Sequence, residues 1–469
     1  MLLFDTLSKN KKELPQKELR LFVCGPTVYD FSHIGHARTY VIFDMFVKYL
    51  RKRGYSVDYL QNITDLDDKI IGRANENKEV PGELAKRFEK EYYADMEALD
   101  VSGVTAYKRA TDHMPEIISQ VKRLIEKECA YEIKKDGIYF DISKFKNYGK
   151  LSGRTALQAQ DATSRIDKSV EKRNKGDFAL WKFSKPDEPK AASAKGFVEP
   201  RWESPWGEGR PGWHIEDTAI TEKYFGSQYD IHGGGRDLIF PHHEAEIAQM
   251  ESISGKEPLV EFWMHPGFLV VNGEKMSKSL NNFVTIRDAL KNYSPQTLRL
   301  FFTTKHYRSP IDWTPDSLVE SVSNENKLKD FWLSVQNVKE DNSAEEEKEI
   351  EKRIKNFWGF LEDDFNTPRA FAELFGLMNF VHKTNSLSAS DKNKTSEFLK
   401  DINAVFNVVN EENLSAAVNI TPEILKLADE REKMRQEKNW ERADELRKKI
   451  EEKGYEIKDT ENGPQIRKR

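Results

Sequence analysis

The sequence is poor in cysteine and has no long apolar run. Only Cys24 and Cys129 occur in its 469 residues, which excludes a disulfide framework. A thiol at a functional turn is then more typical of a metal ligand or a reactive group. No apolar run approaches the roughly 20 residues that cross a bilayer, and the first residues lack a signal-peptide pattern. We therefore expect a cytoplasmic protein with no membrane association.

The sequence also lacks an excess of charge of either sign. Its 74 lysine and arginine residues nearly balance 79 aspartate and glutamate residues, for a net charge of -5. This balance excludes binding of nucleic acid through an overall positive field, so any nucleic-acid surface must be local. The length is sufficient for about two to four domains with a large core.

A segment near the N-terminus has the pattern of a strand that turns into a helix. Residues 19–23 are mostly apolar, apolar residues recur at helical spacing over residues 37–53, and glycine and proline lie between the two stretches. This order is typical of the opening of an α/β nucleotide-binding unit. It places His33, Gly35 and His36 at a helix N-terminus, where backbone N–H groups and the helix dipole favour phosphate. Two surface histidines in a turn are the plainer alternative.

A second motif is the stretch Lys275–Ser279, with the sequence KMSKS. Lysines on a mobile loop can close over the phosphates of ATP and stabilise pyrophosphate as it leaves. A basic loop alone is more often solvated surface. In this order, however, the histidine turn and the lysine loop resemble the two signatures of class I aminoacyl-tRNA synthetases. The resemblance implies that the two histidines, Lys275 and Lys278 are catalytic groups that act on ATP and its Mg²⁺.

A glycine-rich turn, Gly233–Gly235, follows a predicted strand and precedes a helix predicted over residues 242–254. Backbone without side chains can pack against a flat ligand such as adenine, which makes Gly234 and Gly235 candidate ATP-binding residues. Asp237 is a candidate acceptor for the ribose hydroxyls. Such turns are common, and this one gains weight from the potential metal ligands that follow it.

Several of these polar residues are predicted to meet at one end of the sheet. His242 and Glu246 are four residues apart and so share one helix face, and Cys24 follows the first strand. Their surroundings resemble cysteinyl-tRNA synthetases over nearly the whole chain. The motifs that carry this resemblance are Cys24, Asn62–Lys69 (NITDLDDK), Pro211–Glu216 (PGWHIE), His232–Gly235 (HGGG) and Phe240–Glu244 (FPHHE).

In that family two cysteines, a histidine and a glutamate hold a zinc ion that takes the thiolate of the substrate. The resemblance assigns Cys24, Asp217, His242 and Glu246 to these four positions. Asp217 departs from the family, which has its second cysteine there. Zinc accepts aspartate oxygen, but a hard carboxylate in place of a soft thiolate should alter the metal preference. Asp217 either ligates the ion, lies beside the ligands or faces away from them, and we expect ligation.

The resemblance also implies that Gly25, Thr64, Trp213 and His232 bind L-cysteine. A pocket alone rejects serine poorly because hydroxyl and thiol are similar in size, whereas zinc favours the thiolate. A separate editing domain is then unnecessary, in agreement with the short insertion predicted at residues 130–210.

The C-terminal region is predicted to be a tRNA-binding unit. From composition alone, its charged sequence is more typical of a solvated amphipathic helix. The resemblance, however, assigns Arg435, Trp440, Asp444 and Asp459 to the anticodon, and an exposed aromatic with carboxylate acceptors suits unpaired bases. The family usually ends with Gly-Thr-x-Trp, and this chain has Gly463–Ile466 (GPQI) instead.

We predict an α/β fold with a Rossmann-type parallel-sheet catalytic domain split by an insertion, then a helical domain and a small anticodon-binding unit. The insertion is expected to be mostly irregular after a strand at 137–142. The helical domain is expected to break at about 386–394, and the last unit to be one long helix before a strand at 455–458. The predicted boundaries are 1–129 for the first half of the catalytic domain, 130–210 for the insertion, 211–314 for the second half, 315–415 for the helical bundle and 421–469 for the last unit.

The leading hypothesis is a monomeric cysteine–tRNA ligase that uses ATP, Mg²⁺ and zinc to attach L-cysteine to tRNA(Cys). A second hypothesis is a ligase that passes activated cysteine to a small amine, as a mycothiol-pathway relative of the family does. The C-terminal unit opposes that alternative, because the relative lacks it. A third hypothesis is a non-catalytic RNA-binding relative, which the intact histidine and lysine motifs oppose.

Overall fold

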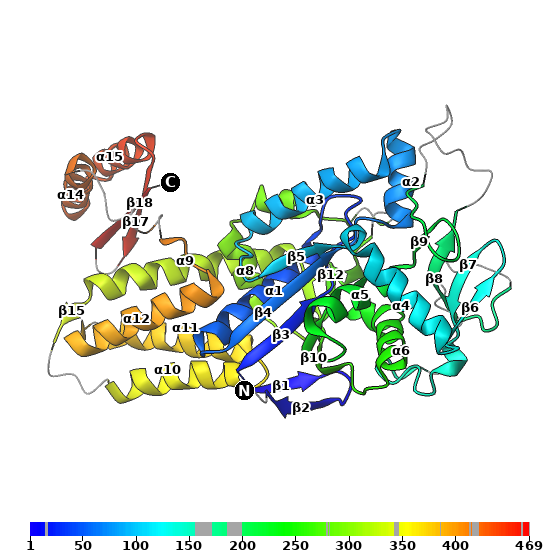
Figure 1. Ribbon diagram of the computed structural model, residues 1–469. Coiled ribbons are helices and arrows are strands. Elements are labelled where there is room, and N and C mark those ends of the chain that lie inside the picture. The colour runs from blue at the N-terminus through cyan, green and yellow to red at the C-terminus, as the bar shows by residue number, and fades with distance from the viewer. Residues whose placement is uncertain are drawn as a thin grey trace.

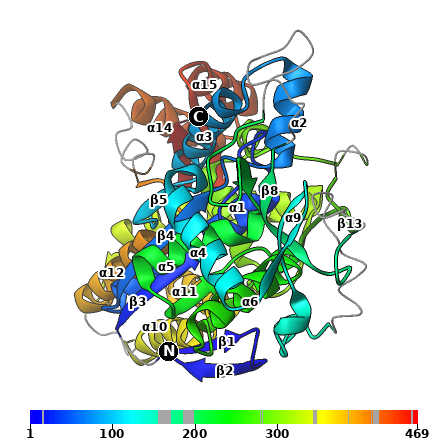
Figure 2. The ribbon, with the colours of Figure 1, turned by 45° about the vertical axis from the view of Figure 1, so that its right-hand side comes forward.

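The computed structural model describes residues 1–14, 17–154, 171–184, 199–277, 280, 282–341, 347–384, 386–411, 414, 422–460 and 463–468, with the backbone alone given for 339, 422, 425, 458–460 and 463–468. A twisted sheet occupies the centre of the molecule, with a helical bundle on one side and an antiparallel insertion on the other (Figure 1). The N-terminal hairpin, β1 Leu2–Asp5 and β2 Asn10–Glu13, lies at the bottom in both views, and the C-terminus lies at the top (Figure 2).

The central sheet is wholly parallel and has the order β11-β10-β3-β4-β5. The chain therefore builds outward in one direction from β3 and in the other from β10, and the point between these two strands is the topological switch point where ligands bind in such sheets. The strands are β3 Glu18–Val23, β4 Ser56–Ile63, β5 Ala106–Arg109, β10 Tyr229–Gly233 and β11 Val260–Met264.

Helices cover both faces of this sheet, as the alternation along β3 requires. Leu21 and Val23 belong to one apolar core with α1, whereas Phe22 and Cys24 belong to another with α4, α5 and α6. The helices of the catalytic domain are α1 Ile34–Lys52, α2 Asp68–Asn77, α3 Pro81–Ala98, α4 Met114–Glu126, α5 Trp213–Phe225 and α6 His242–Ser254. None of the helices in the described ranges combines the length and apolar character needed to cross a bilayer.

The insertion contains a four-stranded antiparallel sheet in the order β6-β7-β8-β9. The prediction of irregular sequence after residue 142 was therefore wrong for β8, which buries Trp181 completely against the second core. A six-residue strand gives little periodicity, and its pairing partners lie far away in the sequence. The strands are β6 Ala130–Ile133, β7 Gly137–Phe140, β8 Phe178–Phe183 and β9 Gly209–Pro211.

A small sheet of order β13-β12-β14 carries the lysine loop and leads into the helical bundle. Its elements are β12 Leu269–Val271, β13 Glu274–Lys275 and β14 Ile311–Trp313, with the short helices α7 Ile286–Leu290 and α8 Pro295–Thr303. The bundle consists of α9 Pro315–Asn337, α10 Glu347–Glu362, α11 Thr367–Thr384 and α12 Ala389–Phe406, with β15 Lys339–Glu340 paired to β16 Ser386–Leu387.

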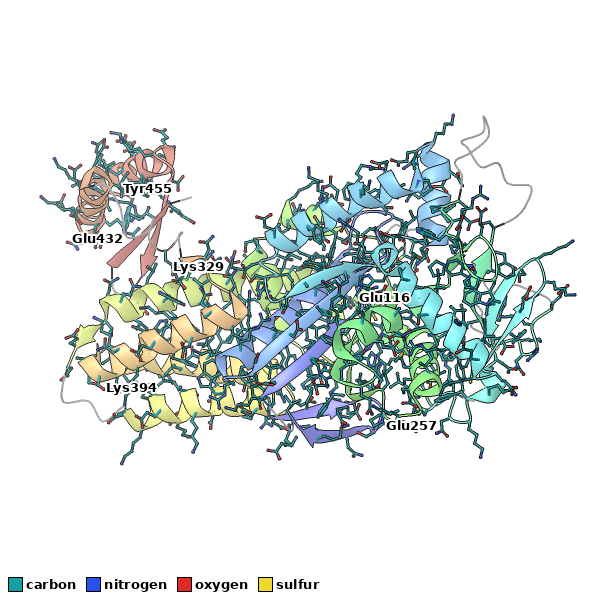
Figure 3. The ribbon with its side chains drawn as sticks, in the orientation of Figure 1. Glu116, Glu257, Lys329, Lys394, Glu432 and Tyr455 are labelled. Atoms are coloured by element: carbon teal, nitrogen blue, oxygen red, sulfur yellow. The ribbon has the colours of Figure 1, made fainter. Side chains whose placement is uncertain are left out.

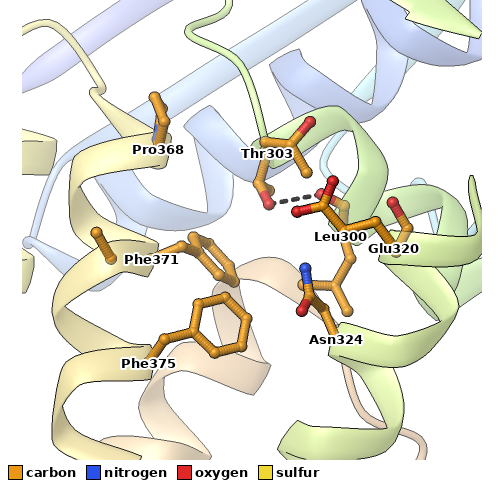
Figure 4. Close-up of a pocket in the computed structure, with 10 residues that line it drawn as sticks. Leu300, Thr303, Glu320, Asn324, Pro368, Phe371 and Phe375 are labelled. Carbon is orange, nitrogen blue, oxygen red and sulfur yellow. Dashed lines mark hydrogen bonds between the residues drawn. The ribbon is translucent and has the colours of Figure 1, made fainter. Parts of the chain in front are cut away.

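The predicted break at 386–394 was too long, because α12 begins at Ala389. The Ser388 side chain accepts a hydrogen bond from Asp391 N and caps the helix, so polar residues that suggested a loop form the first turn. A pocket of 290 Å³ opens among α8, α9 and α11, where Phe371 and Phe375 face Leu300 (Figure 4). Its lining comes from these helices rather than from the central sheet.

The C-terminal unit is separated from the body of the molecule in Figure 1, and Figure 3 labels Glu432 and Tyr455 within it. One long helix was predicted, but the chain turns at Lys438, whose φ of 59° is left-handed, and Asn439 then caps a second helix. A small core of its own holds the unit together. Its elements are α14 Pro422–Gln436, α15 Trp440–Glu452, β17 Tyr455–Thr460 and β18 Gly463–Lys468.

Candidate active site

The predicted metal ligands meet at the carboxyl ends of β3 and β10, at the switch point of the sheet. Cys24 directly follows β3, and its backbone N–H donates to Gly233 O at 3.0 Å, which ties it to β10. Asp217 comes from the first turns of α5, and His242 and Glu246 from α6. The site therefore joins elements from both halves of the split domain.

All four predicted ligands are buried, and one donor atom of each lies within 4.8 Å of the others. His242 Nε2 lies 3.0 Å from Asp217 Oδ2 and 3.2 Å from Glu246 Oε1. The helix spacing that predicted one shared face for His242 and Glu246 is confirmed. Asp217 belongs to the same cluster, although sequence reasoning left open whether it would lie beside it.

The electrostatics of this cluster fit a divalent cation. Within the described ranges, no hydrogen bond reaches either carboxylate oxygen of Glu246, although His242 lies close by, and no lysine or arginine pairs with Asp217 or Glu246. Burial, reinforced by Asp217, raises the pKa of Glu246 well above its usual value. Burial also raises the pKa of the Cys24 thiol, with smaller contributions from Asp217 and Glu246. A cation would stabilise these anions, and one sulfur, one imidazole and two carboxylates suit four-coordinate zinc.

His243 is a residue that the sequence analysis missed. Its Nε2 lies 3.2 Å from Cys24 Sγ, and the Nε2 of His232 lies 3.3 Å from the same sulfur, so that these residues form a second cluster with Glu246. Burial lowers the pKa of both imidazoles well below the usual value. His243 is three residues before Glu246, and this i,i+3 spacing on the predicted helix is the pattern that would have indicated it.

Of the four residues assigned to cysteine binding, Trp213 and His232 contact predicted ligands directly, whereas Thr64 and Gly25 are linked to Asp217 through Asn62. The Trp213 ring stacks on His242 with centroids 4.1 Å apart, and His232 contacts Cys24. Thr64 Oγ1 and Gly25 N both hydrogen-bond to the side chain of Asn62, a further residue that the sequence analysis missed. A Cβ atom on Gly25 would lie 1.7 Å from Asn62 O, so only glycine fits there. Their contacts with L-cysteine stay a prediction.

The histidine turn lies at the N-terminus of α1, as predicted. His33 is the N-cap residue, and its Nδ1 accepts a hydrogen bond from His36 N at 3.2 Å. His36 Nδ1 in turn accepts from His33 N at 3.4 Å, and the two rings stack with centroids 3.7 Å apart. Burial lowers the pKa of His36, followed by the influence of His33. With Nδ1 occupied as an acceptor, the neutral ring carries its proton on Nε2, which can donate to a phosphate oxygen.

The lysine loop is anchored at the same turn. Ile34 N donates to Val284 O at 3.1 Å and Ile286 N donates to Ser32 O at 2.9 Å, so the segment after the loop pairs with the residues around His33. Lys275 is exposed on β13. Lys278 lies outside the described residues. The structure thus brings the loop's base to the turn, as the phosphate-binding hypothesis requires.

The glycines at the end of β10 and directly after it are required by packing within the protein. A Cβ atom on Gly233 would meet the Phe43 ring at 2.2 Å, and one on Gly234 would meet the His243 ring at 2.9 Å. For Gly235 the neighbour is the carboxylate of Asp237, at 2.5 Å. Asp237 itself is exposed. Contacts of Gly234, Gly235 and Asp237 with ATP stay a prediction.

The proposed anticodon residues are partly assembled on one side of the C-terminal unit. Trp440 is 56% exposed at the start of α15, and the guanidinium carbon of Arg435 lies 5.6 Å from the centre of its ring. Asp444 is exposed one turn further along α15. The side chain of Asp459 lies outside the described residues. Trp440 and Arg435 thus form an exposed platform rather than part of a core.

Comparison with known proteins defines the class. The sequence family described as tRNA synthetases class I (C) catalytic domain matches residues 10–323, and the DALR domain family matches residues 356–410. The structure of Mycobacterium tuberculosis methionyl-tRNA synthetase in complex with methionyl-adenylate superposes with a TM-score of 0.60 at 15% identity, covering 87% of this chain and 95% of that one. The fold is that of a class I aminoacyl-tRNA synthetase, as predicted.

Sequence relatives give the particular family. Cysteine–tRNA ligase of Thermococcus gammatolerans is 44% identical, with 98% of each chain covered. Cysteine–tRNA ligase of Methanococcus maripaludis is 43% identical, covering 97% of this chain and 96% of the relative. The chain belongs to the cysteine–tRNA ligase family.

Proposed function

We propose that the chain activates L-cysteine with ATP to cysteinyl-adenylate and transfers the cysteinyl group to the 3′ end of tRNA(Cys). The observation that carries the proposal is the buried Cys24–Asp217–His242–Glu246 cluster at the switch point of a class I synthetase fold. Membership of the cysteine–tRNA ligase family over nearly the full chain supports it. We expect the enzyme to act as a cytoplasmic monomer.

We assign the cluster as the holder of one zinc ion. When bound, zinc supplies a soft Lewis acid that favours a thiolate over the hydroxyl of serine. Trp213 supports the imidazole of His242 through stacking, and Thr64 and His232 flank the cluster where the amino acid would lie. A pocket without a metal would discriminate one small substrate from another by only about 10–200-fold.

The adenylation step needs positioning and charge stabilisation rather than a protein nucleophile. The carboxylate of L-cysteine attacks the α-phosphorus of ATP, the P–O bond to the leaving group breaks, and pyrophosphate departs. His33 and His36 donate from Nε2 to phosphate oxygens, and Lys275 and Lys278 neutralise the pyrophosphate, which enters as part of ATP with Mg²⁺. Gly234, Gly235 and Asp237 hold the adenosine.

The C-terminal unit is proposed to bind the anticodon. The exposed Trp440 offers a stacking surface for an unpaired base, and Arg435 adds a cation next to it. Asp444 and Asp459 are proposed acceptors for base edges. This unit separates the tRNA ligase from the alternative of a cysteine ligase with a small-amine acceptor.

Cysteine-dependent ATP–pyrophosphate exchange, followed by charging of tRNA(Cys), tests the proposal. We expect exchange with L-cysteine, little with L-serine, and loss of exchange after incubation with a chelator. Charging should depend on the tRNA. Exchange without charging would favour the small-amine ligase, and no exchange with a zinc-loaded chain would favour the RNA-binding relative.

The ligand role of Asp217 has its own test. We expect Asp217→Cys to retain zinc and exchange activity, because it restores the family's thiolate, and Asp217→Ala to lose zinc during dialysis. Zinc content is measured by atomic absorption. A full zinc complement in Asp217→Ala would show that Asp217 is not a ligand.

A further inference from the structure

Asn62 contacts the ligand cluster through Asp217 without being one of the proposed ligands. It is near the end of β4, is 1% exposed and makes three side-chain hydrogen bonds. Its Oδ1 accepts from Gly25 N at 2.5 Å, and its Nδ2 donates to Thr64 Oγ1 at 3.2 Å and to Asp217 Oδ1 at 2.6 Å. A backbone N–H can only donate, so Oδ1 must face Gly25, and this orientation directs the amide N–H groups toward Asp217.

This hydrogen bond divides the two oxygens of Asp217 between two tasks. Oδ1 is taken by Asn62, whereas Oδ2 faces the cluster, 3.0 Å from His242 Nε2. A carboxylate can bind a metal through one oxygen or two. With Oδ1 engaged, Asp217 presents a single donor atom, as a cysteine sulfur would.

We infer that Asn62 is a positioning residue that holds Asp217 as a single-oxygen ligand of the bound ion. It thereby preserves a four-donor site in which aspartate stands where the family has cysteine. Because the same amide also holds Gly25, the residue after Cys24, it fixes the ligand beside β3 relative to the ligand on α5. The inference rests on the proposed ligand role of Asp217.

The test uses the full chain, depleted of metal and titrated with Co²⁺. The d–d absorption of Co²⁺ reports its coordination number, and a sulfur-to-cobalt charge-transfer band reports ligation by Cys24. We expect Asn62→Ala to lower Co²⁺ affinity by about 10–100-fold, the usual cost of removing an outer partner of a ligand. The d–d bands should weaken as Asp217 turns to bind through both oxygens, while the charge-transfer band persists. Asn62→Asp, nearly the same size, should lower affinity further, because it sets a carboxylate against that of Asp217.

Gln61→Leu is the matched control. Gln61 is the preceding residue of β4, is fully buried, and accepts a hydrogen bond from Tyr92 OH at 2.8 Å instead of contacting the cluster. Its loss removes a buried hydrogen bond from the same strand and should leave Co²⁺ affinity and spectrum unchanged. If Asn62 acts mainly through Asp217, most of the effect of Asn62→Ala should also disappear in an Asp217→Ala background, with only the smaller part that acts through Gly25 left.

The outcomes separate this inference from the proposed function. If the wild-type chain shows no sulfur-to-cobalt charge-transfer band when Co²⁺ is added, the proposed metal site itself is wrong. A wild-type chain that binds Co²⁺, with an Asn62→Ala affinity within about twofold and the same spectrum, would overturn only the role of Asn62. Additive losses in the double variant would overturn it as well. If Asn62→Ala does not fold, the near-isosteric Asn62→Asp gives the same decision.

Discussion

The ligand cluster at the carboxyl ends of the central strands and the C-terminal unit differ in how far their functional side chains are exposed to solvent. In the ligand cluster, Asp217 and Glu246 are each 1% exposed or less, Asp217 is held by Asn62, and His242 is held by the buried side chain of His214. In the C-terminal unit, Trp440 is 56% exposed over a core of only a few side chains. Buried anions depend on one another and on a cation, whereas an exposed ring acts alone. Single substitutions in the ligand cluster should therefore abolish cysteine activation, whereas single substitutions in the C-terminal unit should only weaken tRNA binding.

The largest effect is expected from Glu246→Ala. It removes a ligand and leaves a cavity among buried polar groups, so the chain should lose its zinc. Cysteine-dependent exchange should fall by about 10³-fold or more, the equivalent of several kcal/mol of lost charge stabilisation. Metal content and exchange are measured together, with Ser254→Ala at the far end of the same helix as control. A Glu246→Ala chain with full zinc content would contradict the assignment.

His36→Ala should have the next largest effect. It should show that the histidine turn and the ligand cluster have different roles. Removing one preorganised donor to a developing anion typically costs about 10²–10³-fold in turnover. The zinc content should stay at the wild-type level, because neither ring nitrogen of His36 belongs to the cluster. Pyrophosphate exchange at saturating ATP measures the effect. A parallel loss of zinc would show that the two sites are coupled.

The sequence predicts those parts of the site that depend on local spacing. The strand-turn-helix pattern placed His33 and His36 at the N-terminus of α1, and a four-residue spacing placed His242 beside Glu246. It did not reveal the role of Asn62. Asn62 and Asp217 are 155 residues apart in the sequence, and they meet only because the two halves of the catalytic domain join in one parallel sheet. The break at Lys438 was missed for a similar reason, because a lysine in a left-handed turn has no sequence pattern to distinguish it from a helical lysine.

Trp440→Ala tests the other region. Loss of base stacking should cost about 1–3 kcal/mol, or roughly 5–150-fold in KM for tRNA(Cys). Exchange with L-cysteine and ATP should be unaffected, because the substitution lies outside the catalytic domain. Charging kinetics at varied tRNA concentration measure the effect, and Glu430→Gln, at an exposed position of α14, serves as a surface control. Equal KM values in the variant and the wild type would remove Trp440 from the tRNA surface.

The smallest expected effect is a loss of stability at low pH. It should occur around the ligand cluster and not in the C-terminal unit. Burial lowers the pKa of His265, which hydrogen-bonds to His243 and Thr6, to about 3. The unfolded chain protonates this histidine near pH 6.5, so between these values the unfolded state binds more protons and stability falls as the pH is lowered. Between pH 7.5 and 5.5, the lowered pKa of His265 should reduce the free energy of unfolding of the metal-free chain by about 1.4 kcal/mol.

His265→Asn should remove that loss while retaining a group that can bond to Thr6. The measurement is amide hydrogen exchange of residues 260–265, corrected for the pH dependence of intrinsic exchange and made with chelator present. Residues 422–469 contain no histidine, so exchange from α15 should be the same in the variant and the wild type at each pH. If the corrected exchange rates of residues 260–265 depend on pH as strongly in the variant as in the wild type, other groups, such as the buried carboxyls, control the acid sensitivity of this region.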